Sequence, residues 1–216
     1  FTMKDAYSFD RDLQGLDISY NKMNSAYIRA FNRMGLKYRI VSADVGVMGG
    51  LLSEEFQAET KTGEDILVLC DKCDYASNIE VATCLDDEKT NSDEELISEL
   101  THTPNLKTVE EISNFLKLGK DKIVKTLIYN IDGSLYAILL KSSDELNEVK
   151  LKKELNAKVL ELANEKDVEK VTKSKVGFAG PVNLEIPIII DNAILNMKNF
   201  VTGANKTDYH LINVNI

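Results

Sequence analysis

The chain has 216 residues, of which 44% are apolar, and its formal net charge is -9 at pH 7. A chain of this length and composition can bury a sizeable core in one or two domains. Its longest apolar runs, such as 135–140 and 186–190, are far shorter than the roughly 20 residues that span a bilayer, so no membrane-spanning helix is expected. The acidic balance argues against an extended nucleic-acid surface.

The charge is distributed unevenly along the chain. Residues 1–90 carry 16 acidic and 10 basic side chains, whereas residues 91–216 carry 19 and 16. Lysines of the second part gather at 117–125 and 166–175. Either group could contact a few phosphates, although a solvated face is the commoner role of such lysines.

The three cysteines are Cys70, Cys73 and Cys84, which is too few for a disulfide framework and fits a reducing, cytoplasmic compartment. With His102 they could suggest zinc, but only the pair Cys70-x-x-Cys73 has a diagnostic spacing. We therefore expect loop cysteines and no metal site. The chain begins on Phe1 without a leader pattern, and we expect a fragment of a longer protein.

The first elements are predicted from alternation and helical spacing. Residues 1–9 alternate as a strand does, and Asp10 or Asp12 offers an N-cap for a helix. Apolar residues spaced by three and four predict one buried stripe that stops at Gly35. Further strands are predicted at 38–44, 55–60 and 65–69. Together these elements predict part of an antiparallel sheet with a helix.

The polar, acidic stretch 86–95 has the composition of an exposed linker, so we place a domain boundary between residues 85 and 86. Beyond it, the capping-box pattern that starts at Thr108 predicts a short helix, and the pair Asp132-Gly133 predicts a hairpin. The remaining predictions are helices at 144–164, 167–173 and 192–199, and strands at 186–190 and 209–214. The mixture indicates an α/β fold for residues 86–216.

The stretch 176–183 holds Gly177, Gly180 and Pro181 and predicts a stiff, exposed turn. Most such turns are connectors, and Gly180 is expected only to let this one bend. Asp191 closes an apolar strand, where an acid either caps the next helix or enters a pocket. His210 opens the last predicted strand and is either packed in the core or aimed into a cleft.

Several ordered motifs resemble bacterial-type prolyl-tRNA synthetases, which are class II ligases. Those of the first part run from Phe1 to Asp10, from Asp44 to Phe56 and from Cys70 to Asn78. Those of the second part resemble the editing domain inserted in that family: Val124-Lys125-Thr126-Leu127, Gly177-x-x-x-Pro181, Asp191, and Gly203-Ala204-Asn205 with His210. The resemblance covers essentially the whole chain.

For the first part, the resemblance implies the edge of an ATP site at Phe1 and Asp5, within part of the class II antiparallel sheet. The full-length ligase would use ATP and Mg²⁺ to activate proline, would transfer it to tRNA(Pro), and would be a homodimer. Other motifs of that site lie outside these residues, so the chain itself is not expected to aminoacylate tRNA. The family usually has histidine where this chain has Glu54.

For the second part, the resemblance implies hydrolysis of alanyl-tRNA(Pro), because a pocket sized for proline excludes alanine by only about 1–3 kcal/mol. The implied catalytic residues are Lys125, Gly177, Asp191 and His210. Residues of the editing pocket and loop are Thr126, Pro181 and Asn205. Editing of this kind needs the acceptor end of tRNA(Pro) but no cofactor. A non-catalytic domain that binds the tRNA acceptor end is the alternative.

Overall fold

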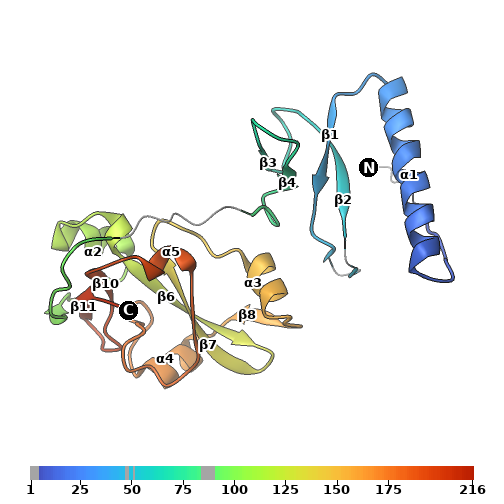
Figure 1. Cartoon of the computed structure of the whole chain (residues 1–216). Coiled ribbons are helices and arrows are strands. Elements are labelled where there is room, and N and C mark those ends of the chain that lie inside the picture. The colour runs from blue at the N-terminus through green and yellow to red at the C-terminus, as the bar shows by residue number, and fades with distance from the viewer. Residues whose placement is uncertain (1–4, 47–48, 51, 84–90) are drawn as a thin grey trace. The chain divides into compact units, whose positions relative to one another are not determined.

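The computed structural model describes residues 5–46, 49–50, 52–83 and 91–216 (Figure 1). It divides into two compact units, Phe1–Ala82 and Thr83–Ile216. The boundary predicted between residues 85 and 86 lies outside the described residues. Among the helices of the described ranges, none combines the length and the apolar character that crossing a membrane requires.

The first unit opens with the long helix α1 (Leu13–Arg33), which confirms the predicted helix. Asp12, rather than Asp10, is the N-cap, and its carboxylate accepts a hydrogen bond from the Gly15 N–H at 2.8 Å. The predicted burial of the stripe is wrong, because no residue of α1 is buried. Only part of the helix packs on the sheet, and Leu13 remains 70% exposed.

The sheet of this unit has the order β2-β1-β4-β3. Its strands are β1 (Tyr38–Ser42), β2 (Glu54–Ala58), β3 (Leu67–Leu69) and β4 (Ala76–Asn78). Strand β1 pairs antiparallel with β2 but parallel with β4, so the sheet is mixed and not purely antiparallel. Residues 5–9 form no strand, since none of the described strands pairs with them; residues 1–4 lie outside the described ranges.

Aromatic side chains fasten α1 to the sheet. Neighbouring ring centroids lie 5.4–6.1 Å apart among Tyr27, Phe31, Tyr38 and Phe56. The Glu54 carboxylate adds a polar tie, because it accepts hydrogen bonds from the Tyr20 hydroxyl at 2.7 Å and from the Asn24 amide at 3.2 Å. Burial, and then this bond to Glu54, raises the pKa of Tyr20 to about 12. Glu54 therefore links helix and sheet.

The second unit contains two sheets, β8-β6-β7-β9 and β10-β11-β5. Its strands are β5 (Glu99–His102), β6 (Val124–Ile131), β7 (Ser134–Lys141), β8 (Leu160–Leu162), β9 (Ile188–Ile190), β10 (Phe200–Gly203) and β11 (Tyr209–Val214). Its helices are α2 (Val109–Leu116), α3 (Glu148–Glu154), α4 (Glu165–Thr172) and α5 (Asn192–Leu195), with a 3₁₀ turn, η2, at Lys120–Lys122. A parallel bridge between Ile123 and Val201 joins the two sheets.

The predicted hairpin is confirmed as β6 and β7, and its turn residues Asp132 and Gly133 both have positive φ. The helix predicted over 144–164 is wrong in its second part. There Leu160–Leu162 form β8, because they pair with Tyr129–Ile131 of β6. The short strands β5 and β10 were likewise not predicted, and the helix predicted at 192–199 ends at Leu195.

Strands β6 and β7 are covered on both faces. On one face, a core cluster forms against α4, α5, β10 and β11 and includes Val124, Ile128, Leu139, Val168, Ile194 and Phe200. On the other face, a second cluster includes Tyr129, Ile138, Leu140 and Leu151 of α3. Side chains that project from β6 are therefore held by a rigid, doubly packed strand.

The capping box of α2 offers a test of local stability. The Thr108 hydroxyl accepts from the Glu111 N–H at 3.2 Å, and the Glu111 carboxylate accepts from the Thr108 N–H at 2.9 Å. Replacing Thr108 with alanine should lower the free energy of unfolding by about 1 kcal/mol, measured by urea denaturation. The variant Thr108→Ser keeps the acceptor oxygen and should retain most of the stability. Equal losses in both variants would contradict this role of the cap.

Candidate functional site

Lys125 is the second residue of β6 and pairs with Leu140 of β7. Asp191 directly follows β9, and its N–H donates to the Leu139 carbonyl at 3.1 Å. Asp191 and Lys125 therefore lie on either side of β7, about 10 Å apart if each strand spacing is about 4.8 Å. The sheet thus brings these two predicted residues into one row.

Gly203 extends this row on the other side of β6. The bridge between Ile123 and Val201 is parallel, so Gly203, two residues after Val201, comes beside Lys125, two residues after Ile123. Because β10 ends at Gly203, the row reaches the place where the loop 177–182 meets the sheet.

The loop 177–182 packs directly on Gly203. A Cβ on Gly203 would lie 2.2 Å from the Ala179 carbonyl oxygen, and a Cβ on Gly180 would lie 1.7 Å from the Gly203 carbonyl oxygen. The expectation that Gly180 only lets the loop bend is wrong, because its φ lies outside the left-handed region. Gly180 is required instead for the close approach of two backbones.

Asn205 clamps the same loop with its entire side-chain amide. Its Oδ1 accepts from the Gly180 N–H at 2.8 Å, and its Nδ2 donates to the carbonyls of Gly180 and Val182, both at 2.9 Å. Its own backbone N–H donates to the Phe178 carbonyl at 2.9 Å. These bonds hold the loop, so we assign Asn205 to positioning within the predicted editing loop.

The ends of the loop are also constrained. Gly177 has a φ of +102°, and a Cβ there would lie 2.9 Å from the Cβ of Lys107. No group within the described ranges accepts a hydrogen bond from its N–H. Pro181 is half-buried, and its carbonyl accepts from the Leu184 N–H at 3.4 Å. Gly177 therefore offers an amide donor on a loop with little freedom to move.

His210 is buried, at 3% exposure, and does not open into a cleft. Its Nδ1 lies 2.7 Å from the Thr103 hydroxyl, and its ring centroid lies 5.5 Å from that of Phe178. Burial lowers the pKa of His210 to about 4, so the imidazole is neutral near pH 7. The ring thus supports Phe178, and through it the loop, as an uncharged group.

Two hydroxyls near the row are buried without a partner among the described residues. They belong to Thr126, the neighbour of Lys125 on β6, and to Thr202, the neighbour of Gly203 on β10. A buried polar group left unpaired costs about 1–3 kcal/mol. The free hydroxyl of Thr126 is compatible with its predicted contact to substrate, whereas Thr202 had no sequence signal beyond its place in an apolar run.

The two charged residues of the row have local partners. The Lys125 ammonium donates to the Asp144 carbonyl, and the Asp191 carboxylate accepts from the Ala193 N–H at 2.8 Å and so caps α5. Asp191 was predicted either to cap the next helix or to enter a pocket. In the structure it caps the helix. Among residues not predicted for the site, Phe178 and Thr103 support His210; neither lies in a local pattern that would have indicated this contact.

The predicted ATP edge and the pair Cys70 and Cys73 lie in the first unit. Phe1 is outside the described residues, and Asp5 is exposed in a segment without regular structure, so the ATP edge stays a prediction. Cys70 and Cys73 are free and exposed, and Cys84 is outside the described residues. In the part of the chain that the structure describes, no group of three or more His, Cys, Asp or Glu side chains is placed to hold a metal ion.

Known proteins resemble this chain in its second unit and along its whole length. Residues 103–215 match the family model described as the aminoacyl-tRNA editing domain. The whole chain is 51% identical, over 216 residues, to the proline–tRNA ligase of Caldicellulosiruptor saccharolyticus and 51% identical, over 219, to that of Thermoanaerobacter pseudethanolicus. It spans 38% of the length of each. The crystal structure of the hypothetical protein APE2540 matches 54% of this chain and 80% of its own, with 27% identity and a TM-score of 0.49.

The clamp can be tested by removing the Asn205 side chain while keeping its backbone freedom. Asn205 has a φ of +51°, so Asn205→Gly introduces no strain but leaves polar groups of the loop unpaired. We expect the free energy of unfolding to fall by about 2 kcal/mol, and the Gly180 amide to exchange faster with deuterium. Asn156→Gly is the matched control, since Asn156 also has a positive φ, of +49°, and its side-chain amide holds no loop within the described ranges. Equal effects of both substitutions would exclude the clamp.

The depressed pKa of His210 predicts a pH-dependent stability. The unfolded histidine binds a proton below about pH 6.5 but the folded one only near pH 4, so stability is fully present above pH 6.5 and is lost as the pH falls towards 4. Between pH 7 and 5 this group alone should lower the free energy of unfolding by about 2 kcal/mol. His210→Gln should flatten this slope, whereas His102→Gln, at an exposed position, should not. An unchanged slope in His210→Gln would refute the assignment.

Proposed function

Because the chain belongs to the aminoacyl-tRNA editing domain family through its residues 103–215, and aligns along its length with a segment of proline–tRNA ligases, we propose that it hydrolyses the ester of alanyl-tRNA(Pro). The reaction adds water to the ester, releases alanine and leaves the tRNA with a free 3′ end. The observation that supports this proposal is the clamped glycine loop, which packs on Gly203 at the end of the strand that bridges to the start of β6.

Ester hydrolysis requires a positioned water, donors for the developing oxyanion, and an anchor for the RNA end. The N–H of Gly177 is the proposed oxyanion donor. It suits this task because the Asn205 clamp and the contact of Gly180 with Gly203 hold its loop before substrate arrives. A preorganised donor needs no rearrangement as charge develops, which is the main source of such stabilisation.

Lys125 is proposed to contact the terminal phosphate or ribose as a cation, exchanging its bond to the Asp144 carbonyl for a charged acceptor. Thr126 projects from the other face of β6, so its free, buried hydroxyl would bind a polar group of the substrate on that face. Asp191 would shape the pocket through its cap of α5. His210, neutral and buried, would act through Phe178 on the loop rather than by proton transfer.

Selectivity for alanine follows from size. A ligase pocket built for proline also admits the smaller alanine, and the difference in binding is only about 1–3 kcal/mol. A second site that admits alanine and excludes proline removes the error. The rigid loop, held by Asn205 and Pro181, would supply the wall that proline cannot pass.

We propose that a longer chain, resembling these relatives in length, forms a homodimer and ligates proline to tRNA(Pro). ATP would supply the energy for that activation, and Mg²⁺ would accompany it. Phe1 and Asp5 would border the ATP site only when the missing parts of that site are present. No step of the proposed ester hydrolysis depends on ATP or Mg²⁺.

The second candidate is a domain that binds the tRNA acceptor end without turnover. It is favoured by one observation, namely that the charged groups of Lys125 and Asp191 already have partners within the protein. Charged tRNA that binds tightly and keeps its ester would support this reading over hydrolysis.

Lys125→Met tests the catalytic proposal. We expect alanine release from alanyl-tRNA(Pro) to slow at least about tenfold, because a charge-assisted hydrogen bond contributes about 1.5–3 kcal/mol. Release of radiolabelled alanine under single-turnover conditions measures it, with prolyl-tRNA(Pro) as the substrate that should stay intact. Lys170→Met, at an exposed position of α4, is the control and should match the parent chain. Identical rates in both variants would remove Lys125 from the mechanism.

A further inference from the structure

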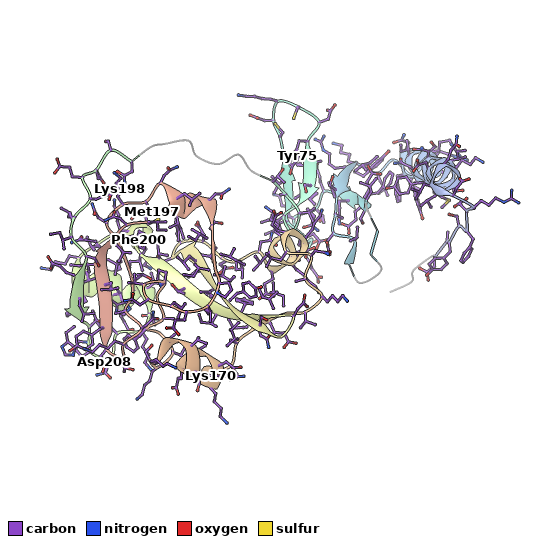
Figure 2. All side chains as sticks on the ribbon, turned by 60° about the horizontal axis from the view of Figure 1, so that its bottom comes forward. Tyr75, Lys170, Met197, Lys198, Phe200 and Asp208 are labelled. Carbon is purple, nitrogen blue, oxygen red and sulfur yellow. The ribbon has the colours of Figure 1, made fainter. Side chains whose placement is uncertain are left out.

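A hollow of about 160 Å³ lies near the start of β6, apart from the loop 177–182. Three lysines from different elements line it: Lys122 at the end of η2, Lys141 at the end of β7, and Lys198 before β10. Asn196 and Met197 contribute to the same wall. Figure 2 shows Met197, Lys198 and Phe200 close together at one end of this unit, whereas Lys170 of α4 projects from another.

The convergence of these lysines is a property of the fold. Lys122 belongs to a lysine-rich stretch, but Lys141 and Lys198 join it only because β7 and the start of β10 flank β6. Among the described residues that line the hollow, Asp121 carries the one carboxylate. Within the described ranges no carboxylate pairs with Lys141. These three lysines line one hollow, so their positive charges act on the same space.

An acidic segment, residues 93–95, lies against the same lysines. The Lys122 ammonium is 3.8 Å from the Asp93 carboxylate, and the Lys198 ammonium is 3.4 Å from the Glu95 carboxylate. Lys198 also donates to the Asp93 carbonyl at 3.0 Å. All four charged side chains are partly exposed, and ion pairs of this kind contribute little to stability. A stronger anion could therefore replace them.

The backbone of this segment is tied independently of the charges. The Asn199 amide donates to the Glu94 carbonyl at 2.8 Å, and its oxygen accepts from the Leu96 N–H at 2.8 Å. Rotation of the Asp93 and Glu95 side chains would therefore uncover the lysines without detaching the segment.

We propose that this hollow binds backbone phosphates of the substrate RNA, and that Asp93 and Glu95 occupy its lysines when no RNA is bound. This inference rests on the proposed function for the identity of the RNA. RNA fits better than a small anion, because lysines from three elements can follow successive phosphates, and each contact neutralises one charge. Because Asp93 and Glu95 compete for the lysines, they lower the affinity of the hollow for any anion. Binding is therefore restricted to a partner that carries several phosphates.

The position of the hollow indicates which part of the RNA it meets. Lys122 precedes Lys125 by three residues, so their Cα atoms are at most about 10 Å apart. Lys141 pairs with Val124, whereas Leu140 pairs with Lys125, and neighbouring side chains on a strand point to opposite faces. The hollow therefore lies close to the row formed by Asp191, Lys125 and Gly203, but not on it. It would contact nucleotides that precede the esterified one. Its lysines should govern RNA affinity and not the chemical step.

The experiment uses the 216-residue chain and a fluorescent transcript of tRNA(Pro), with the dissociation constant measured by anisotropy from 50 to 200 mM salt. The double variant Lys141→Gln/Lys198→Gln should bind about tenfold more weakly at 50 mM, and its slope of log K against log salt should fall by about 2. The variant Asp93→Asn/Glu95→Gln should bind about threefold more tightly. Lys170→Gln, with one exposed charge removed from α4, should change affinity less than twofold.

Opposite signs for the lysine and acid variants are the decisive result. If the lysine double variant binds as Lys170→Gln does, or if the acid variant binds more weakly than the parent, the proposal is overturned; an absence of RNA binding by the parent overturns it as well. Circular dichroism must show that all variants remain folded. Alanine release at saturating RNA separates the two proposals. A parent chain that binds RNA through these lysines but releases no alanine would refute the proposed hydrolysis and leave the hollow standing.

Discussion

The second unit depends on the close approach of two glycine backbones, at Gly180 and Gly203. Neither position has room for a Cβ, since the nearest carbonyl oxygens would lie 1.7 and 2.2 Å away. The contact is held by Asn205, whose amide satisfies three groups of the loop. Its loss would leave those polar groups unpaired, and the loop would no longer have one position relative to β10.

The other features of the site follow from this contact. With the loop fixed, the Gly177 amide has a defined direction, and Phe178 closes over the neutral ring of His210. Lys125 projects from β6, a strand that is packed on both faces. The proposed chemistry therefore uses one backbone donor on a fixed loop and one lysine cation. The lysine hollow would add affinity for the RNA from outside this row.

Sequence patterns predicted those parts of the fold that short-range interactions decide. The caps at Asp12 and Thr108 and the turn at Asp132 involve groups three or fewer residues apart, and each was found as expected. Short strands such as β8 failed because Leu160–Leu162 become a strand only through β6. The stripe of α1 was predicted as buried, but in this chain only part of it meets the sheet.

By itself, the sequence determined the capped helices, the hairpin, the stiff loop and the resemblance that pointed to Lys125, Gly177 and Asn205. The tertiary structure alone decided that Gly180 serves close packing, that His210 is buried and neutral, and that lysines from three elements share one hollow. The physical reason is distance along the chain. Caps and turns join near neighbours, whereas Gly180 and Asn205 are 25 residues apart and meet only when the sheets are assembled.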